Sequence, residues 1–260
     1  MRQGNSIFIT GAASGIGRET AKLFAAQGWF VGAADLDEGG LRSLQAEIGP
    51  DNCTHGVMDV TDPKGFKATV DDFAEKTGGK MDVLFNNAGI LRMGPNEAIP
   101  LEQQHLTINV NVNGLLTGVA CSLDYLKRTP GARIISMCST SSVYGLPELA
   151  VYSASKHAVA ALTEALDLEL EQYGIAVSDI MAPYVSTPMV TAARTHAHSI
   201  ESTGVNLKPE QIAALVWKAA HGRKRHWKIH YLTYVLFGTF WALPFLRRPM
   251  TKMLCLTPKK

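Results

Sequence analysis

The stretch that decides the fold stands near the amino terminus and reads Thr10-Gly11-Ala12-Ala13-Ser14-Gly15-Ile16-Gly17. It follows a short apolar run, Ser6–Thr10, and leads into an apolar pattern with helical period. Glycines let a backbone turn approach a pyrophosphate closely, and the following helix presents free N–H groups and a positive dipole end to the phosphates. The stretch therefore predicts a strand, a phosphate-binding turn and a helix, although alone it could be only a tight strand-to-helix turn.

Further apolar runs alternate with helical patterns along the chain. We expect strands at Ser6–Thr10, Trp29–Asp35, Cys53–Asp59, Asp82–Asn86, Ala132–Ser139, Ile175–Ala182 and, on the weakest pattern, Lys228–Leu232. We expect helices at about 15–27, 37–48, 63–78, 101–127, 150–173 and 209–221. Strands separated by helices pair in parallel through right-handed crossovers. The pattern predicts an α/β fold, a Rossmann-type doubly wound parallel sheet of seven strands in a single domain.

The composition is that of an ordinary globular protein. The chain has 260 residues, of which 46% are hydrophobic and 18% charged, enough to build one large core. The four cysteines show neither a Cys-x-x-Cys pair nor metal-ligand spacing, so we expect no metal site and no disulfide framework. No secretory signal precedes the first strand, so we expect a cytoplasmic protein without a nucleic-acid partner.

The net charge of +2 conceals an asymmetry along the chain. Residues 211–260 contain ten basic residues and no acidic one, which leaves 15 basic against 23 acidic residues in the rest, a net of −8. We therefore divide the chain into a dinucleotide-binding and catalytic part, 1–222, and a basic, apolar C-terminal extension of the same domain, 223–260.

Within the extension, residues 231–246 are apolar and aromatic and lie between basic clusters. Sixteen residues interrupted by Pro244 are short of the roughly 20 that a membrane-spanning helix needs. The segment could pack over the substrate pocket or a subunit boundary. Alternatively, it could lie in a membrane interface, which would make the protein peripherally membrane-associated.

An acidic residue at the end of the second expected strand bears on the choice of cofactor. Asp35 lies 18 residues beyond Gly17, where a carboxylate can accept hydrogen bonds from the adenosine ribose and repel a 2′-phosphate. Asp37 is the alternative for this role, and either residue could be only an exposed turn aspartate. The turn itself carries no Arg or Lys to hold a 2′-phosphate. Both observations favour NAD over NADP.

A second motif predicts acid–base chemistry. Tyr152 and Lys156 stand four residues apart near the start of an expected helix, so they share one face, and a nearby ammonium is expected to favour the phenolate. Ser139 lies thirteen residues earlier, at the carboxyl end of the fifth expected strand. Doubly wound proteins place their active sites at this edge of the sheet. The neighbouring hydroxyls of residues 140–142 are alternatives to Ser139 for this role. A further alternative is that any of these side chains only caps the turn.

Together these motifs resemble the short-chain dehydrogenases/reductases. The signature Thr-Gly-x-x-x-Gly-x-Gly is followed in the expected order by Asp59-Val60, Asn86-Asn87-Ala88-Gly89, Asn111-Val112-Asn113-Gly114, Ser139 with Tyr152 and Lys156, and Pro183-Tyr184-Val185-Ser186-Thr187. The resemblance covers residues 5 to about 220. It departs at Tyr184, where the family usually has glycine, which leaves open a different backbone near nicotinamide and a ring that intrudes on the substrate side.

The resemblance implies a catalytic set of Asn111, Ser139, Tyr152 and Lys156, in which Asn111 is selected over Asn109 and Asn113 as the residue that holds a water in a proton relay. It also implies that NAD contacts Gly11, Ala13, Ser14, Gly15, Ile16, Gly17, Asp35, Asp59, Val60, Asn87, Ala88, Gly89, Tyr152, Lys156, Pro183, Val185 and Thr187. A loop at about 188–209 would cover the substrate. The implied reaction is hydride transfer to or from a small or medium apolar alcohol or ketone, in a homodimer or homotetramer.

Two other functions remain open on the same fold. One is an NADP-dependent 3-oxoacyl reductase acting on carrier-linked substrates, which Asp35 and the turn without a basic residue disfavour. The other is a non-catalytic nucleotide-sensing protein, which would be expected to lack the tyrosine or the lysine.

Overall fold

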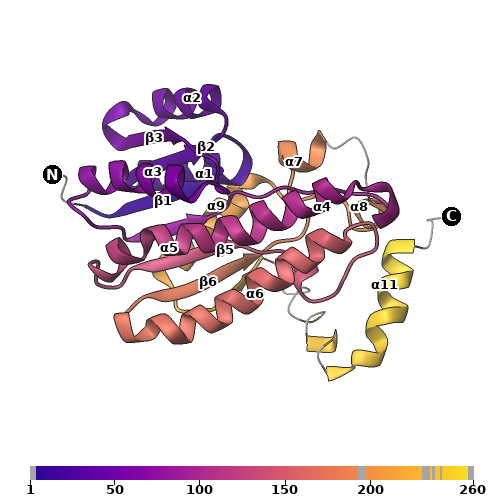
Figure 1. Ribbon diagram of the computed structural model, residues 1–260. Coiled ribbons are helices and arrows are strands. Elements are labelled where there is room, and N and C mark those ends of the chain that lie inside the picture. The colour runs from indigo at the N-terminus through magenta and orange to yellow at the C-terminus, as the bar shows by residue number, and fades with distance from the viewer. Residues whose placement is uncertain (1–3, 193–196, 230–234, 236–237, 241, 257–260) are drawn as a thin grey trace.

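The computed structural model describes residues 4–192, 197–229, 235, 238–240 and 242–256. Seven parallel strands form one sheet in the order β3-β2-β1-β4-β5-β6-β7 (Figure 1). Their bounds are Ser6–Thr10 (β1), Phe30–Asp35 (β2), Cys53–Val57 (β3), Val83–Asn86 (β4), Arg133–Met137 (β5), Ala176–Met181 (β6) and His226–Lys228 (β7). The predicted doubly wound sheet is confirmed. Its order reverses between β1 and β4, which is where such sheets bind ligands.

Helices cover both faces of the sheet (Figure 1). One face packs against α1 (Gly15–Ala26), α2 (Glu38–Ile48) and α9 (Pro209–His221). The other packs against α3 (Pro63–Lys76), α5 (Gly114–Lys127) and α6 (Ala150–Leu170). The inner strands β1 and β4 are buried on both faces, which explains why they read as continuous apolar runs rather than alternating ones.

The predicted helix at 101–127 consists of three parts. It begins as α4 (Leu101–Ile108), passes through a π-helical turn, η3 (Asn109–Asn113), and continues as α5. By length and composition this run could cross a membrane. However, its side chains Leu115, Val119 and Leu126 belong to the hydrophobic core, so we regard it as a core helix of the sheet.

The interior strand β1 is joined to the central strand β4 by side chains as well as by the backbone ladder. Ile7–Ile9 pair with Val83–Phe85. At the start of β1, both the backbone N–H and the hydroxyl of Ser6 donate to Asp82 Oδ2, at 2.8 and 2.9 Å. These bonds join two segments that are 76 residues apart in the chain.

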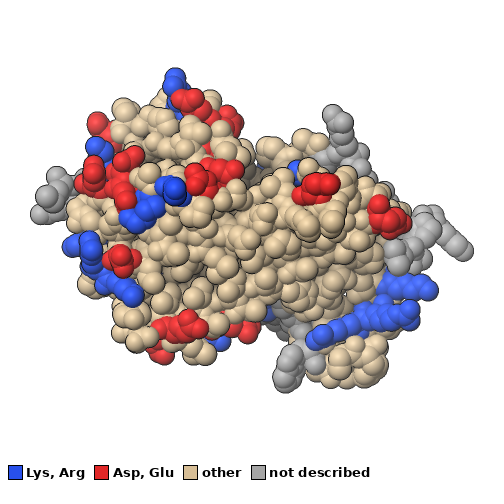
Figure 2. Space-filling model, viewed as in Figure 1, with Lys and Arg blue, Asp and Glu red and all other residues tan. Residues whose placement is uncertain are grey.

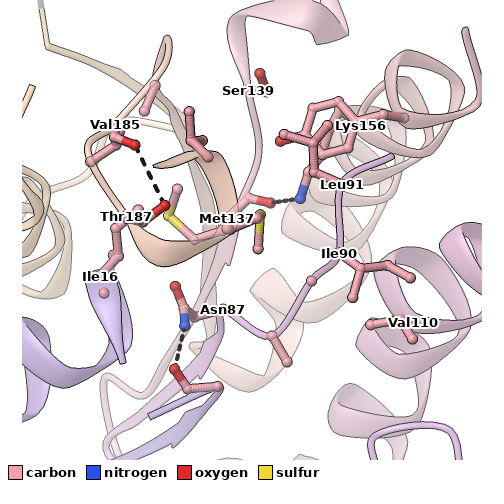
Figure 3. A pocket seen from close by; sticks show the side chains of 18 of the residues that line it. Ile16, Asn87, Ile90, Leu91, Val110, Met137, Ser139, Lys156, Val185 and Thr187 are labelled. Carbon is pink, nitrogen blue, oxygen red and sulfur yellow. Dashed lines mark hydrogen bonds between the residues drawn. The ribbon is translucent and has the colours of Figure 1, made fainter. Parts of the chain in front are cut away.

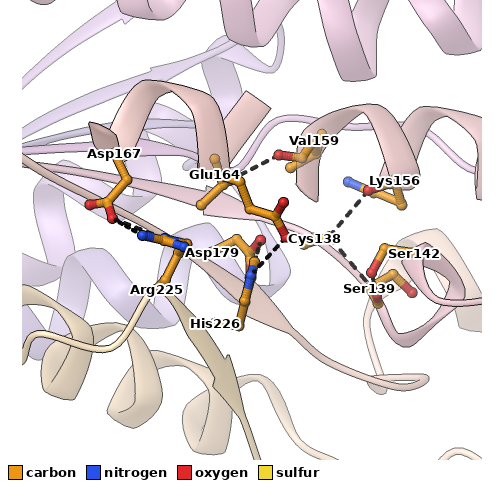
Figure 4. A network of polar contacts seen from close by, with 11 residues as sticks. Cys138, Ser139, Ser142, Lys156, Val159, Glu164, Asp167, Asp179, Arg225 and His226 are labelled. Carbon is orange, nitrogen blue, oxygen red and sulfur yellow. Dashed lines mark hydrogen bonds and ion pairs between the residues drawn. The ribbon is translucent and has the colours of Figure 1, made fainter. Parts of the chain in front are cut away.

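The last strand lies earlier than predicted. We expected it at Lys228–Leu232, whereas β7 runs from His226 to Lys228, and residues 230–232 lie outside the described residues. Polar contacts hold it in register, because His226 Nδ1 lies 3.0 Å from Asp179 Oδ2 on β6, and Arg225 Nε donates to Asp167 at 2.9 Å (Figure 4). A search for apolar runs does not find this strand, because polar side chains fix its position.

The buried pair of Asp179 and His226 has perturbed ionisation. Burial raises the pKa of the Asp179 carboxyl, although the bond to His226 opposes this. The same bond raises the pKa of His226 above its ordinary value, against the effect of burial. His226 Nε2 also lies 3.3 Å from Glu164 Oε1 on α6, so this histidine joins β7 to both its neighbouring strand and a covering helix.

Shorter elements complete the chain. These are η1 (Pro50–Asn52), η2 (Asn96–Ala98), η4 (Thr140–Ser142), η5 (Glu171–Tyr173), α7 (Pro188–Thr191), α8 (His198–Thr203), η6 (Pro244–Leu246) and α11 (Arg247–Leu256). The helix α11 packs against α8, far from it in sequence, at the end of the molecule where the sheet's carboxyl edge opens (Figure 1).

Candidate active site

A pocket of about 360 Å³ opens at the carboxyl ends of the strands, around the point where strand order reverses (Figure 3). Most of the residues predicted from the sequence line it: Gly11, Ser14, Gly15, Ile16, Asp35, Asp59, Val60, Asn87, Ala88, Gly89, Ser139, Tyr152, Lys156, Pro183, Val185 and Thr187. Three predicted residues, Ala13, Gly17 and Asn111, do not line it and lie just behind its wall. The structure therefore brings together side chains drawn from most of the chain's length.

The turn after β1 has the geometry of a phosphate cradle. Gly11 has a φ of 69°, which favours glycine. A Cβ at Gly17 would lie 2.0 Å from the carbonyl oxygen of Gly11, so only glycine fits there. Ser14 caps α1 without a side-chain hydrogen bond, and the first turn of α1 contains no acidic residue. The positive end of the α1 dipole thus faces the pocket, with no acidic side chain in the first turn to offset it, which suits a pyrophosphate.

The two candidate aspartates after β2 have different positions. Both oxygens of Asp35 accept backbone hydrogen bonds, Oδ2 from Ala13 at 3.0 Å and Oδ1 from Asp37 at 3.1 Å. Asp37 instead caps α2, where its carboxylate accepts from Gly40 at 3.0 Å, and it does not line the pocket. Of the two, only Asp35 lines the pocket.

The segment after β4 is fastened to the turn after β1. The Thr10 hydroxyl accepts from the backbone N–H groups of Asn87 and Ala88, both at 3.0 Å. The Asn87 side chain donates to the carbonyls of Thr10 and Gly11, at 2.9 and 3.0 Å (Figure 3). Asn87 therefore shapes the cradle through the backbone. Thr10 was part of the predicted motif, but its role as the fastening residue was not foreseen.

Ser139 and Tyr152 meet at the other end of the pocket. Ser139 lies beyond the end of β5, and its Oγ accepts from the backbone N–H of Ser141 at 3.2 Å, so it also caps the short helix η4. Burial raises the pKa of Tyr152, and a hydrogen bond with the Ser139 side chain opposes this only in part. Burial therefore acts against the expected shift of Tyr152 toward phenolate.

Lys156 stands beside Tyr152 on the same face of α6. Its Nζ lies 5.5 Å from the centre of the Tyr152 ring and donates to the carbonyl oxygen of Met137 at 2.7 Å (Figure 3). Burial lowers the pKa of Lys156. Burial thus disfavours charge on both residues, which leaves Tyr152 protonated and able to donate at neutral pH.

Asn111 occupies the π-helical turn behind this pair. Its Oδ1 accepts from Ile90 N at 2.8 Å, and its Nδ2 donates to Ile90 O at 3.0 Å and to Ser155 Oγ at 3.1 Å. It also borders a second, small cavity shared with Lys156, with about 10 Å³ of room for the centre of a water molecule. That is near the lower limit for one ordered water. The structure thus places Asn111 next to Lys156 across a water-sized space.

The loop after β6 closes the pocket from the opposite side. Val185 forms a bridge with Leu207, and the Thr187 hydroxyl points back to the Val185 carbonyl at 3.4 Å. Tyr184 directly precedes Val185 and lines the pocket. Its hydroxyl lies 2.6 Å from the Ser199 hydroxyl on α8, so the expected intrusion of the ring on the substrate side agrees with its position.

Apolar side chains form the catalytic end of the pocket, and of these the sequence analysis covered only Val190, through the predicted substrate loop. Leu91, Leu146, Leu149 and Val190 belong to one buried cluster, together with Ala197 and Cys255 of α11. Leu146 and Leu149 lie in an irregular segment without apolar period, which offered no signal. Ile90 and Leu36 directly follow predicted motif residues, and this adjacency could have revealed them.

The described part of the C-terminal extension supports this cluster from outside. Phe240 is fully buried, with its ring at 4.9 Å from that of Tyr144, and Arg247 Nε donates to the Phe240 carbonyl at 2.8 Å. This agrees with the expectation that the extension packs over the pocket region. Most of the apolar segment's first half, 230–234 and 236–237, lies outside the described residues.

This site defines a dinucleotide-dependent dehydrogenase, and comparison with known proteins supports the class. Residues 5–198 match the family model described as short chain dehydrogenase. The chain belongs to the short-chain dehydrogenase/reductase family, whose members interconvert alcohols and carbonyl compounds, and it is an oxidoreductase of that kind.

Individual relatives differ in substrate. The chain is 33% identical over 220 residues to the 3-oxoacyl-[acyl-carrier-protein] reductase of Thermotoga maritima, covering 82% of this chain and 89% of that protein. It is 34% identical over 227 residues to the 3-beta-hydroxysteroid dehydrogenase of Comamonas testosteroni, covering 82% and 87%. A solved short-chain dehydrogenase/reductase from Burkholderia phymatum, in complex with NAD, matches with a TM-score of 0.85 at 25% identity, covering 99% of this chain and 98% of that one.

Proposed function

We propose that this protein is an NAD-dependent oxidoreductase that transfers a hydride between nicotinamide and a small or medium, apolar secondary alcohol or ketone. The observation that carries the proposal is the convergence of Ser139, Tyr152 and Lys156 at one end of a pocket whose other end holds Asp35. The leucines around the catalytic end favour an apolar substrate.

The dinucleotide would be held by the residues predicted from the sequence. The turn Gly11–Gly17 would receive the pyrophosphate, Asp35 the adenosine ribose, and Asp59 with Val60 the adenine. Asn87, Ala88 and Gly89 would contact the middle of the cofactor, and Pro183, Val185 and Thr187 its nicotinamide end. When bound, nicotinamide supplies or accepts the hydride, which is the part of the chemistry that no side chain here can perform.

The chain's own groups would hold the substrate oxygen and move its proton. In ketone reduction, the Ser139 hydroxyl donates a hydrogen bond to the carbonyl oxygen, and Tyr152 transfers its proton to the same oxygen. Lys156 would stabilise the tyrosinate that results and bind the nicotinamide ribose. Asn111 would hold a water in the small cavity beside Lys156, through which the proton is replaced. Oxidation of the alcohol follows the same path in reverse.

Steady-state assays with both cofactors test this proposal. Purified protein should oxidise NADH with cyclic or short-chain ketones, and the rate should depend on Tyr152. A carrier-linked reductase would instead require a 3-oxoacyl thioester and would prefer NADPH. A nucleotide-sensing protein would bind NADH without turnover across the panel. Absence of turnover with every ketone, steroid and 3-oxoacyl substrate would overturn the proposed activity.

We also infer a homo-oligomer, with its interface on the side formed by α4, α5 and α6. This side carries few charges (Figure 2), and it exposes leucines, with Leu101 at 60%, Leu116 at 41% and Leu168 at 65% of full exposure. Exposed leucines on a side with few charges favour a protein interface there. Light scattering on the purified protein would distinguish monomer, dimer and tetramer.

A third proposal concerns the outer side of the C-terminal extension, which we infer contacts anionic membrane surfaces. Phe245 and Met253 are 71% and 62% exposed. They accompany the basic residues of α11, which form a basic strip at one end of the molecule (Figure 2). Exposed aromatic and aliphatic side chains next to cations suit a lipid interface. The cytoplasmic location remains a prediction.

A further inference from the structure

Tyr184 lines the pocket at the position where the last motif departs from the family pattern, and it lies where it can decide which substrates fit. It follows Pro183 directly after β6 and lines the pocket together with Leu149, Val190 and Tyr152. It packs against the apolar cluster at the catalytic end. A glycine at this position would leave the space of the phenol ring open, so Tyr184 fills volume next to the acid–base residue.

The hydroxyl of Tyr184 is anchored to a different element. It lies 2.6 Å from the hydroxyl of Ser199, which is 3% exposed and belongs to α8. The start of α8 is itself held by Glu148, whose carboxylate accepts from His198 N at 2.7 Å and lies 2.9 Å from His198 Nδ1. Glu148 lies two residues before Ala150, the first residue of the helix that carries Tyr152. The Tyr184 ring is therefore fixed at both ends rather than free to swing out of the pocket.

The size of the pocket makes this ring consequential. Its volume of about 360 Å³ includes the nucleotide end lined by Asp35 and Asp59, so only part of the space remains for substrate. Leu146, Leu149 and Tyr184 all line the pocket, and Tyr184 packs against the cluster that contains both leucines. Removing the six ring carbons and the hydroxyl would free room for about one further carbocycle.

We propose that Tyr184, fixed by its hydrogen bond to Ser199, is a specificity-determining residue that restricts the substrate to an apolar alcohol or ketone of about one ring. This inference rests on the proposed dehydrogenase function. Its chemistry is steric, since the anchored ring excludes bulk beyond the first ring and takes no part in proton or hydride transfer.

The test compares a one-ring ketone, cyclohexanone, with a two-ring ketone, 2-decalone, in the full-length protein. Native protein should favour cyclohexanone in kcat/KM, and Tyr184→Ala should shift the ratio toward 2-decalone by at least tenfold. Tyr184→Phe and Ser199→Ala remove the same hydrogen bond, so each should shift the ratio by a few-fold, and combining them should add little. These shifts should appear mainly in KM, with kcat and NADH affinity within about twofold.

Tyr144→Phe is the matched control, because Tyr144 packs against the same cluster without lining the pocket. It should leave the ratio unchanged. A ratio within twofold of native for Tyr184→Ala, or effects of Tyr184→Phe and Ser199→Ala that simply add, would overturn the proposal.

The same comparison can be made without turnover. Binding of both ketones to the NADH complex, followed by NADH fluorescence, reports the size preference even if no variant reduces either ketone. Loss of turnover with the preference intact would refute the proposed function alone. An unaltered binding preference in Tyr184→Ala would refute the role of Tyr184.

Discussion

Cofactor choice provides the most quantitative test, through replacement of Asp35 by asparagine. The native carboxylate is held in place by two backbone donors, Ala13 N and Asp37 N. It therefore cannot easily turn away from a 2′-phosphate. Asparagine has nearly the same shape and retains one oxygen acceptor, so this change removes the charge with little change in the turn.

The magnitude follows from Coulomb's law. Two unit charges 4 Å apart interact by about 1 kcal/mol in bulk water and about 4 kcal/mol near a protein surface. Asp35 is only partly buried, so we take the lower part of this range, about 2 kcal/mol against the whole phosphate. Since ~1.4 kcal/mol is a factor of ten, native protein should bind NADH about thirtyfold more tightly than NADPH.

Fluorescence titration with NADH and NADPH measures this preference directly. In Asp35→Asn it should fall to about threefold or less, while Asp37→Asn should keep it, because Asp37 caps α2 away from the pocket. The native preference should also weaken as salt is added, since partly exposed charges are screened. Equal affinity of native protein for both cofactors, or full preference in Asp35→Asn, would refute the reasoning.

Three further changes address other parts of the molecule. Tyr152→Phe should lower kcat at least a hundredfold and leave NADH affinity within a few-fold, because only the proton donor is lost; activity above a tenth of native would contradict the assignment. The pKa of His226 is raised in the folded protein, so its protonated ring stabilises the fold. This stabilisation is fully present below the ordinary histidine pKa of about 6.5 and is lost as pH rises through the pKa of the folded protein, at up to about 1.4 kcal/mol per pH unit. Urea unfolding across this window should show a slope in native protein that His226→Gln lacks, and identical slopes would exclude the histidine as its source. Deleting residues 233–260 should preserve NADH binding but raise KM for bulky apolar alcohols or change the oligomeric state. It should also abolish salt-sensitive co-sedimentation with anionic vesicles. A truncated protein equal to native in all these assays would leave the extension without the proposed roles.

The residues that sequence alone located are those whose spacing reflects a local geometric requirement. Gly11 and Gly17 were predictable because a phosphate-binding turn has no room for side chains, as the short distance from a Gly17 Cβ to the Gly11 carbonyl shows. Tyr152 and Lys156 were predictable because four residues make about one helical turn. In each case, the geometric requirement and the sequence motif that reveals it lie within a few residues of one another.

Features that depend on distant segments were not predictable in this way. The Met137 carbonyl that accepts from Lys156 is a backbone atom, which leaves no trace in the side-chain pattern. Burial sets the direction of the Tyr152 pKa, and burial depends on the whole pocket. The structure distinguishes Asp35 from Asp37 only at the start of α2, where Asp37 serves as the cap.

The position of β1 between β2 and β4 also affects how a newly made chain reaches this structure. Its partner on one side, β2, follows within about 20 residues, whereas β4 on the other side is made more than 70 residues later. At synthesis rates of about 5–20 residues per second, the second edge of β1 waits roughly 4–15 s for β4 to emerge from the ribosome. An open strand edge is a template for pairing with other chains. The yield of correctly folded protein in cells should therefore depend on translation rate and chaperone supply during this interval, more than on the stability of the finished sheet.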